Sequence, residues 1–203
     1  MQTVQHLQLT RNLVIDGQGH YIKDLDAPIL GNCYFGNTSI EIKNLTLKNS
    51  TVNEKYYNGL GSGGFVAYAD NSKSVVFDNC YIEDSTITAT GDFIGIGGII
   101  GYSSSPLTMT DCSAANCTII GAQNSAGALA GHISAGYDST IANAKVADCT
   151  VKGERADKTS YIVRTSNNGN TTITTNACAN NTVFDVADST TVYGRIARAE
   201  HLR

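Results

Sequence analysis

Short runs of alternating apolar and polar residues fill most of the chain, and Asn, Asp or Gly separates one run from the next. The segments Ile40–Leu47 and Val75–Ile82 show the pattern, each with an Asn near its middle. A period of two is typical of half-buried β-strands, and Asn, Asp and Gly favour tight turns. The pattern therefore predicts an all-β protein of short strands joined by sharp corners.

The pattern also repeats along the chain. A polar residue followed by Thr and then by Val or Ile recurs along the chain, and five of its copies are spaced at intervals of 35, 32, 32 and 32 residues. The Thr residues of these five copies are Thr51, Thr86, Thr118, Thr150 and Thr182. Two residues before each Thr stands an Asn or Asp, namely Asn49, Asp84, Asn116, Asp148 and Asn180. Intervals of this length and regularity indicate stacked structural repeats.

Further positions match when the repeats are aligned on this Thr. Seven residues before it stand Asn44, Asn79, Asp111, Asn143 and Thr175. Because Asn and Asp tolerate left-handed backbone, the two polar positions predict two corners in each repeat. A glycine-rich apolar segment such as Gly63–Tyr68 or Gly97–Tyr102 opens most repeats and is expected to form one strand. Each repeat is thus predicted to hold about three strands.

One such repeat alone has no partner for its backbone groups and no second face to bury. Stacking the repeats about 4.8 Å apart solves both problems, because each strand then pairs with its equivalent above and below. The sequence therefore predicts a parallel β-helix, expected to be right-handed as crossovers between parallel strands nearly always are. A β-sandwich also has short strands and regular turns, but it gives no reason for matching positions at this interval.

The repeats divide the chain into an N-terminal cap and a series of rungs within one domain. The cap covers residues 1–26, with strands at Leu13–Ile15 and Tyr21–Ile22 and a turn at Asp16–Gly17. Rungs are expected near residues 27–60, 61–94, 95–123, 124–158 and 159–190, with a partial rung at 191–203. Because the last rung looks unfinished, we expect the chain to be part of a longer protein.

Several segments resemble GLUG-type repeats, in which a run like Gly-Gly-Leu-Val-Gly-Tyr precedes an apolar strand and Asn-Cys. They are Gly97–Tyr102 followed by Leu107–Cys112, and Ala126–Gly131. Ile15–Ile22, followed by Ile42–Leu47, looks like the turns that often precede such repeats. The resemblance covers most of the chain and implies a β-solenoid of a large secreted or surface protein of bacteria, among them adhesins and proteins labelled IgA peptidases. No peptidase motif such as His-Glu-x-x-His or Gly-x-Ser-x-Gly occurs in the chain.

Composition narrows the classes of partner. Of the 203 residues, 16% are charged, and the net charge is -4. The basic residues are spread thinly along the sequence and form no cluster that would indicate nucleic-acid binding. The longest apolar stretch, Phe93–Tyr102, is broken by glycines and is shorter than the roughly 20 residues of a membrane-spanning helix. We therefore expect neither nucleic-acid binding nor membrane insertion.

The chain contains six cysteines, which could form disulfides or bind a metal ion. Cys80 and Cys112 share one aligned position and Cys117 and Cys149 another, so each pair lies one rung apart, within the range of a disulfide. Stacked side chains that point the same way do not automatically reach the required torsion, and a buried Cys behaves as a small hydrophobe. Free thiols are therefore favoured over disulfides. Zinc is not expected, because no second Cys pair or His cluster accompanies Cys112 and Cys117.

No catalytic constellation stands out. Asp84 and Asp148 belong to the predicted corners, and Asp24 and Asp26 lie near the cap. The histidines His6, His20, His132 and His201 fall in separate segments. The sequence therefore predicts no catalytic residue, no metal site and no cofactor. The enzyme alternative is a polysaccharide lyase or glycoside hydrolase, which would need carboxylates converging on one groove.

The rungs differ most after the Thr position, where one segment contains Tyr56 and Tyr57. Loops at one edge of a solenoid commonly bind partners, and tyrosines stack on sugar rings or on proteins. We therefore expect a non-catalytic module, on the cell surface or secreted, that binds a host glycan or protein in cell adhesion. A purely structural stalk or spacer would show the same sequence pattern.

Overall fold

The computed structural model describes residues 7–8, 10–34, 36–54, 60–90, 94–121, 125–134, 136–153, 159–160, 162–165, 171–174, 177–179, 182–183 and 195–196. Every regular element in these ranges is a β-strand, which confirms the predicted all-β class. The same ranges hold no helix long and apolar enough to cross a membrane.

The strands form four sheets, named A to D here. Sheet A contains β1 (Leu7–Gln8), β3 (Leu30–Tyr34), β7 (Val66–Asp70), β11 (Ile100–Ser104), β16 (Ala130–Ile133), β21 (Val163–Thr165) and β25 (Arg195–Ile196). Sheet B contains β2 (Leu13–Lys23), β4 (Ser39–Lys48), β8 (Ser74–Glu83), β12 (Leu107–Thr110), β13 (Ser113–Ala115), β17 (Ser139–Ala142), β18 (Lys145–Ala147), β22 (Thr171–Thr174) and β23 (Ala177–Ala179). Sheet C contains β5 (Thr51–Glu54), β9 (Thr86–Ala89), β14 (Thr118–Gly121), β19 (Thr150–Lys152) and β24 (Thr182–Val183). Sheet D contains β6 (Gly61–Gly63), β10 (Gly95–Gly97), β15 (Ser125–Gly127) and β20 (Thr159–Ser160).

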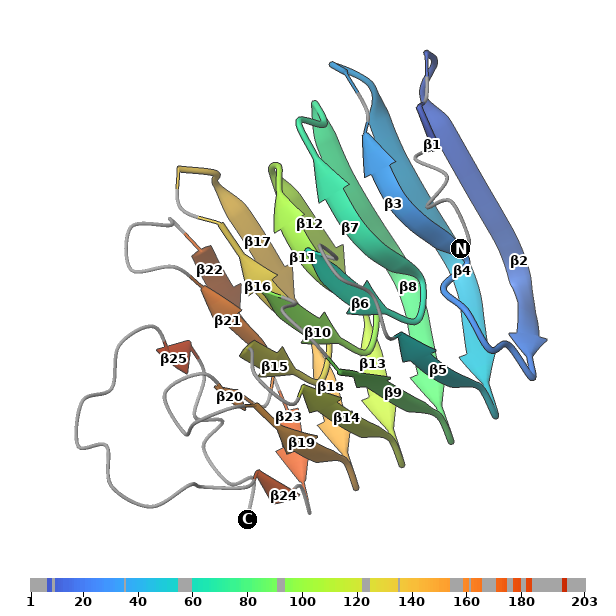
Figure 1. The fold of residues 1–203 in the computed structure, drawn as a ribbon, viewed down its shortest axis with the longest axis vertical. Coiled ribbons are helices and arrows are strands. Elements are labelled where there is room, and N and C mark those ends of the chain that lie inside the picture. Colours follow the sequence, from blue (N-terminus) through green and yellow to red (C-terminus); the bar gives the residue numbers. More distant parts are fainter. Residues whose placement is uncertain are drawn as a thin grey trace.

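The chain winds through sheets D, A, B and C in turn and then begins the next coil (Figure 1). Equivalent strands of successive coils pair in parallel, for example Thr118 of β14 with Thr86 of β9 and Thr150 of β19. Among the described strands only β25 pairs antiparallel, with β21. Four turns have a strand in all four sheets, while the first expected rung contributes only β3, β4 and β5. The predicted parallel β-solenoid with a repeat of about 32 residues is thus confirmed.

The glycine-rich segments differ from the prediction, because each forms two strands rather than one. Segment Gly63–Tyr68 ends β6 and begins β7, with a bend at Gly64 and Phe65. Strands β6 and β7 pack against each other so closely that side chains do not fit between their backbones. A Cβ placed on Gly63 would lie 2.5 Å from the carbonyl oxygen of Val66. The glycines therefore allow backbone contact between sheets D and A, and each full turn passes through four sheets.

The N-terminal segment also departs from the expectation of two strands joined by a turn. It forms one long strand, β2, whose pairing with β4 shifts register between Asp16 and His20. Positive φ angles at Gln18 (52°) and Gly19 (78°) create a bulge at the predicted turn. A bulge on an edge strand twists it and hinders pairing with another chain. Nothing pairs with the outer edge of β2 within the described residues.

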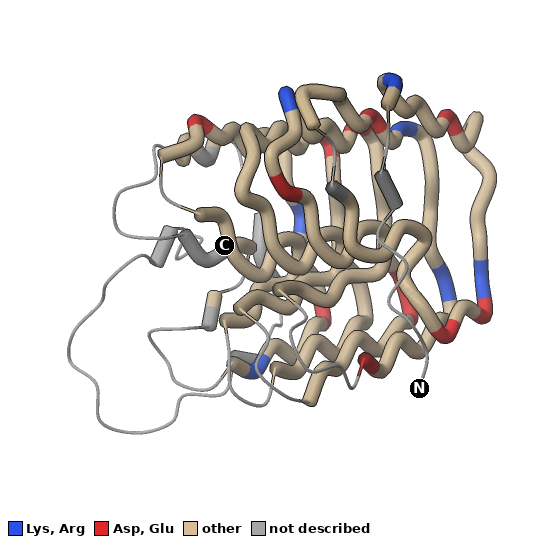
Figure 2. Tube along the Cα trace, turned by 45° about the horizontal axis from the view of Figure 1, so that its top comes forward, with Lys and Arg blue, Asp and Glu red and all other residues tan. Residues whose placement is uncertain are grey.

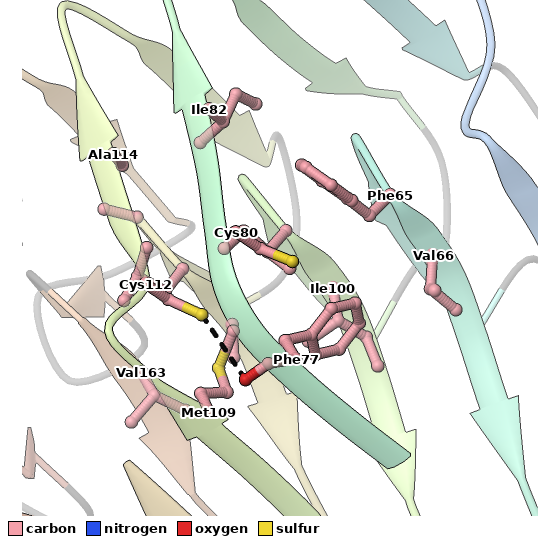
Figure 3. Packing of buried hydrophobic residues seen from close by; sticks show 14 of the residues in the cluster. Phe65, Val66, Phe77, Cys80, Ile82, Ile100, Met109, Cys112, Ala114 and Val163 are labelled. Carbon is pink, nitrogen blue, oxygen red and sulfur yellow. Dashed lines mark hydrogen bonds between the residues drawn. The ribbon is translucent and has the colours of Figure 1, made fainter. Parts of the chain in front are cut away.

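The core fills the interior of the coils with one apolar cluster. Phe77 and Phe65 are fully buried, and their rings meet edge to face with centroids 6.3 Å apart (Figure 3). Successive coils place residues of similar size above one another, as in the row Ile42, Phe77, Met109 and Ile141. The described cysteines lie within this core. Burial along each strand alternates, so the other side chains of sheets B and C face outward.

Candidate functional site

The two predicted corner positions adopt the left-handed backbone expected of Asn and Asp. The first corner contains Asn44, Asn79, Asp111 and Asn143, with φ between 51° and 55°. The second contains Asn49, Asp84, Asn116 and Asp148, with φ between 47° and 54°. Asn180, predicted to continue the second row, lies outside the described residues. These corners separate sheet B from sheet C and divide sheet B into two flat facets.

The corner side chains also bond to one another from coil to coil. The Asn79 amide donates to Asn44 Oδ1 at 2.9 Å, and the Asn44 amide donates to Asp16 Oδ1 at 3.1 Å. In the second row the Asn116 amide donates to Asp84 Oδ1 at 2.7 Å. Hydrogen bonds from the Gln18 backbone and from Asn44 hold the pKa of Asp16 below its usual value. The first row thus joins three successive coils in one hydrogen-bonded ladder.

Replacing Asn79 separates the two roles of a corner residue, which are to adopt left-handed backbone and to form the hydrogen bond between coils. Asn79→Ala removes the ladder hydrogen bond and places an alanine in left-handed backbone, so we expect a loss of about 2–3 kcal/mol in unfolding free energy. Asn79→Gly also loses the hydrogen bond but adopts this backbone without strain, so a loss of about 1 kcal/mol is expected. Denaturant unfolding monitored by circular dichroism gives both values. Equal losses in the two variants would show that backbone strain contributes nothing here.

The Thr residues of the repeat lie opposite one another in sheet C. The pairs run from Thr51 to Thr86, Thr118, Thr150 and Thr182 in consecutive strands. Thr51 is exposed, whereas Thr86, Thr118 and Thr150 are half-buried. The residues that follow them, Val52, Ile87, Ile119 and Val151, are fully buried. The Thr row therefore lies on the outer surface, while the apolar row beside it forms core.

A mixed row of Ser and Cys closes the second corner; the sequence predicted its cysteines as aligned free thiols but not the hydrogen bonds that the row makes. It consists of Ser50, Ser85, Cys117 and Cys149, each just before the Thr of its repeat. Each side chain donates a hydrogen bond to the carbonyl two residues earlier, at 2.8 Å for Ser50, 2.7 Å for Ser85, 3.1 Å for Cys117 and 3.2 Å for Cys149. The shared spacing from the Asn/Asp corner was the signal that could have revealed this role.

The five described cysteines are free thiols, as the sequence favoured, and Cys178 has no described side chain. Cys112 donates to the carbonyls of Thr110 and Phe77, the latter drawn in Figure 3. Burial raises the pKa of Cys33 to about 12. Hydrogen bonding with Cys149 and burial together raise the pKa of Cys117. A thiolate is the reactive form, so the raised pKa values keep Cys33 and Cys117 unreactive, whereas hydrogen bonding with Cys117 lowers the pKa of Cys149.

Substituting Cys117 tests whether the hydrogen bonds of the Ser and Cys row stabilise the second corner. Because Ser50 and Ser85 occupy the same position in other coils, Cys117→Ser is expected to change the unfolding free energy by less than about 1 kcal/mol. Cys117→Ala leaves the Ala115 carbonyl without this donor and is expected to cost about 1–3 kcal/mol. Thermal or denaturant unfolding measures the difference. If the Ser and Ala variants were equally stable, the thiol would act only as a space-filling group.

A row of aromatic rings stacks along sheet A. Tyr102 stacks on Tyr68 with centroids 5.1 Å apart and on His132 at 5.2 Å, both with interplanar angles of 28°. Burial raises the pKa of Tyr68, whose hydroxyl lies 3.3 Å from Ser104 Oγ. Tyr68 and His132 are each only 7% exposed, so this row stabilises the coils rather than presenting a surface. The equivalent positions of Tyr68, Tyr102 and His132, each at the end of a glycine-rich segment, could have revealed the stack.

The facet of sheet B between the two corners presents side chains to solvent, and we call it the Tyr21 facet. Its first outward row consists of Tyr21, Thr46, Tyr81, Ser113 and Lys145. Its second outward row consists of Lys23, Lys48, Glu83, Ala115 and Ala147. Tyr21 is 58% exposed, whereas Tyr81 is half-buried and donates to Asn79 Oδ1. The two tyrosines lie two strands apart, or about 9.6 Å.

Charged groups on this part of the molecule occur mainly in opposite pairs. Lys48 Nζ lies 2.8 Å from Glu83 Oε2 and 5.8 Å from the centre of the Tyr21 ring. On the neighbouring facet, Lys43 Nζ lies 3.2 Å from Glu41 Oε1. Figure 2 shows that acidic and basic residues are interspersed along the described coils, with no face of a single sign. The surface therefore favours a neutral ligand over a polyanion.

The remaining candidates from the sequence are not assembled into a site. Tyr56 and Tyr57, the predicted binding pair, lie outside the described residues, as do His6 and His201. His20 is exposed on β2, far in sequence from the buried His132. Among the residues that the structure describes, no three His, Cys, Asp or Glu side chains are grouped to hold a metal ion.

Comparison with known proteins gives no assignment. No family model, no curated protein and no solved structure matches the chain.

Proposed function

We propose that the chain is a non-catalytic β-solenoid module that binds a glycan through the Tyr21 facet, within a bacterial cell-surface or secreted protein involved in adhesion. The observation that carries the proposal is the outward row with Tyr21 and Tyr81 two strands apart. The cellular setting rests on the resemblance of the repeats to GLUG-type sequences. Tyr rings offer flat apolar surfaces that suit the faces of sugars.

The surroundings of the two rings support this ligand class. The hydrogen-bonded corner row beside them includes Asn44 and Asn79, whose amides suit hydroxyl-rich ligands. Lys48 and Glu83 face solvent as an ion pair and offer a further donor and acceptor. Their charges compensate each other, which favours neutral sugars over acidic ones. The parallel stacking of strands holds these groups at fixed spacing without a loop.

Binding of neutral and acidic glycans to the isolated chain, on an array and then by calorimetry, tests the proposal. We expect binding of at least one neutral glycan, reduced about tenfold or more by Tyr21→Ala combined with Tyr81→Ala. Val14→Ala is the matched control, because Val14 is 56% exposed on the other facet of the same strand. Equal weakening by the control, or no weakening by the tyrosine variant, would contradict the assignment of the facet.

A separate arm addresses the tyrosines predicted from the sequence. If Tyr56→Ala with Tyr57→Ala abolishes binding while the facet variant does not, the binding site lies after the Thr row. Binding of a protein partner in place of glycans would make the module a protein-recognition element. If neither the wild-type chain nor any variant binds a ligand, the result would favour a structural spacer. Cleavage of a polysaccharide during the same assays would favour the enzyme alternative.

A further inference from the structure

The outward rows of the Tyr21 facet run along the axis of the solenoid. Tyr21, Thr46 and Tyr81 are paired in register on β2, β4 and β8, so one follows the other from coil to coil. Along a single strand the facet offers only two outward positions between its corners, such as Tyr81 and Glu83 of β8. Contacts of one kind therefore recur along the axis but not across it.

Each tyrosine ring is positioned by a neighbouring side chain. The Tyr81 hydroxyl donates a hydrogen bond to Asn79 Oδ1 at the corner of β8, so the ring lies along its own strand. The Lys48 ammonium lies 5.8 Å from the centre of the Tyr21 ring. Between the two rings the first outward row contains only the half-buried Thr46. The facet thus presents two ring surfaces about 9.6 Å apart, and a single sugar ring is too small to contact both.

Beyond Tyr81 the facet continues over small, uncharged side chains. Ser113 follows Tyr81 in the next coil, and Ala115 lies two residues further along the same strand. Both are half-buried, and the exposed Lys145 is the first charged residue that the row reaches after Tyr81. At the other end Tyr21 lies on β2, whose outer edge has no paired strand among the described residues. Within this part of the chain, no large side chain of the row closes either end of the facet.

An open row of contacts distinguishes between two forms of glycan ligand. A site for the end of a glycan encloses the terminal sugar, whereas a site for an internal segment is open along its length. We propose that the Tyr21 facet binds an internal segment of a straight, neutral polysaccharide that lies across the strands, parallel to the solenoid axis. The inference rests on the proposed glycan-binding function and adds the form of the glycan and its direction.

The shape and charge of the facet favour this class of polysaccharide. A straight row of contacts matches an extended β-linked chain better than a helical α-linked one. A stiff, extended chain also loses little conformational freedom when it binds. Lys48 and Glu83 form an ion pair across adjacent coils beside the rings, so their charges compensate each other. The polysaccharide therefore needs no charged groups of its own.

The length of the ligand tests its direction. The probes are unbranched β-1,4-linked oligosaccharides of glucose and of mannose, from one sugar to six, measured by calorimetry on the whole chain. We expect affinity to rise about tenfold or more between the single sugar and the shortest oligosaccharide that reaches both rings, because the second ring then adds its contact. Blocking the reducing end of the longer oligosaccharides should leave their affinity unchanged. An α-1,4-linked glucose series should show no such rise.

Three variants connect the effect of length to the two rings. Tyr81→Ala should abolish the gain in affinity with length while leaving the weak affinity for the single sugar. Tyr81→Ser combined with Ser113→Tyr keeps the composition but moves the second ring to about 14 Å from Tyr21, so a longer oligosaccharide should be needed for the gain. Val14→Ala, on the other facet of β2, should retain the wild-type dependence on length.

The outcomes separate this inference from the proposed function. Equal affinity for single sugars and long chains would overturn the axial arrangement but leave glycan binding by the facet intact. Loss of binding on blocking the end sugar, or an equal gain with the α-linked series, would likewise overturn it. If the chain binds neutral glycans on the array but none of the β-1,4-linked probes, the proposed ligand class is wrong. Failure to bind any glycan would remove the proposed function, and this inference with it.

Discussion

Gly97→Ala is expected to destabilise the chain by at least about 4 kcal/mol, enough to prevent folding of a domain of ordinary stability. A Cβ at this position would lie 2.1 Å from the Ile100 carbonyl oxygen and 2.6 Å from the Gly131 backbone nitrogen. Both obstacles are backbone atoms that belong to paired strands, so neither moves without separating sheet D from sheet A. Soluble expression and circular dichroism of the variant measure the effect.

Gly31→Ala provides the matched control for this substitution. Gly31 lies in β3 of sheet A, is exposed, and has no atom within 4 Å of the place where a Cβ would stand. Alanine there restricts the unfolded chain without strain in the folded one, so we expect stability to be unchanged or raised by up to about 1 kcal/mol. If Gly97→Ala folded as well as Gly31→Ala, sheets D and A would not be in backbone contact.

The sequence predicted those features in which equivalent residues recur from coil to coil. Thr86 and Thr118 pair because stacking brings equivalent positions together, so an aligned sequence already contains their register. The corners at Asn79 and Asp84 were predictable for a different reason, since few other residues tolerate left-handed backbone. In both cases the residues of a single repeat determine the feature, and the same residues occur again in the following repeats.

Other features depend on contacts between segments and left a weaker pattern. The split of Gly63–Tyr68 into two strands follows from the approach of sheet D to sheet A, which no single segment encodes. The β2 bulge at Gln18 arises because β2 has more residues than β4 between paired positions.

Phe77→Ala is expected to cost about 3–5 kcal/mol, because it opens a cavity at the centre of the core. Phe77 is fully buried, its ring meets Phe65 at 84°, and its row neighbours Ile42 and Met109 are fixed by strand pairing. The hydrogen bonds between coils keep the strands from closing the space, so little of the loss is recovered by relaxation. The midpoint of denaturant unfolding should fall with the slope unchanged.

Phe77→Leu distinguishes cavity formation from loss of the aromatic contact. Leucine is close in size to the Ile and Met residues that occupy this row in neighbouring coils, so we expect a loss of only about 1–2 kcal/mol. A leucine variant as unstable as the alanine variant would mean that the edge-to-face contact with Phe65 dominates. Each coil contacts only its neighbours, so destabilising the coil that contains Phe77 weakens its interfaces with the coils on either side. The strands at the end of the solenoid should then open first.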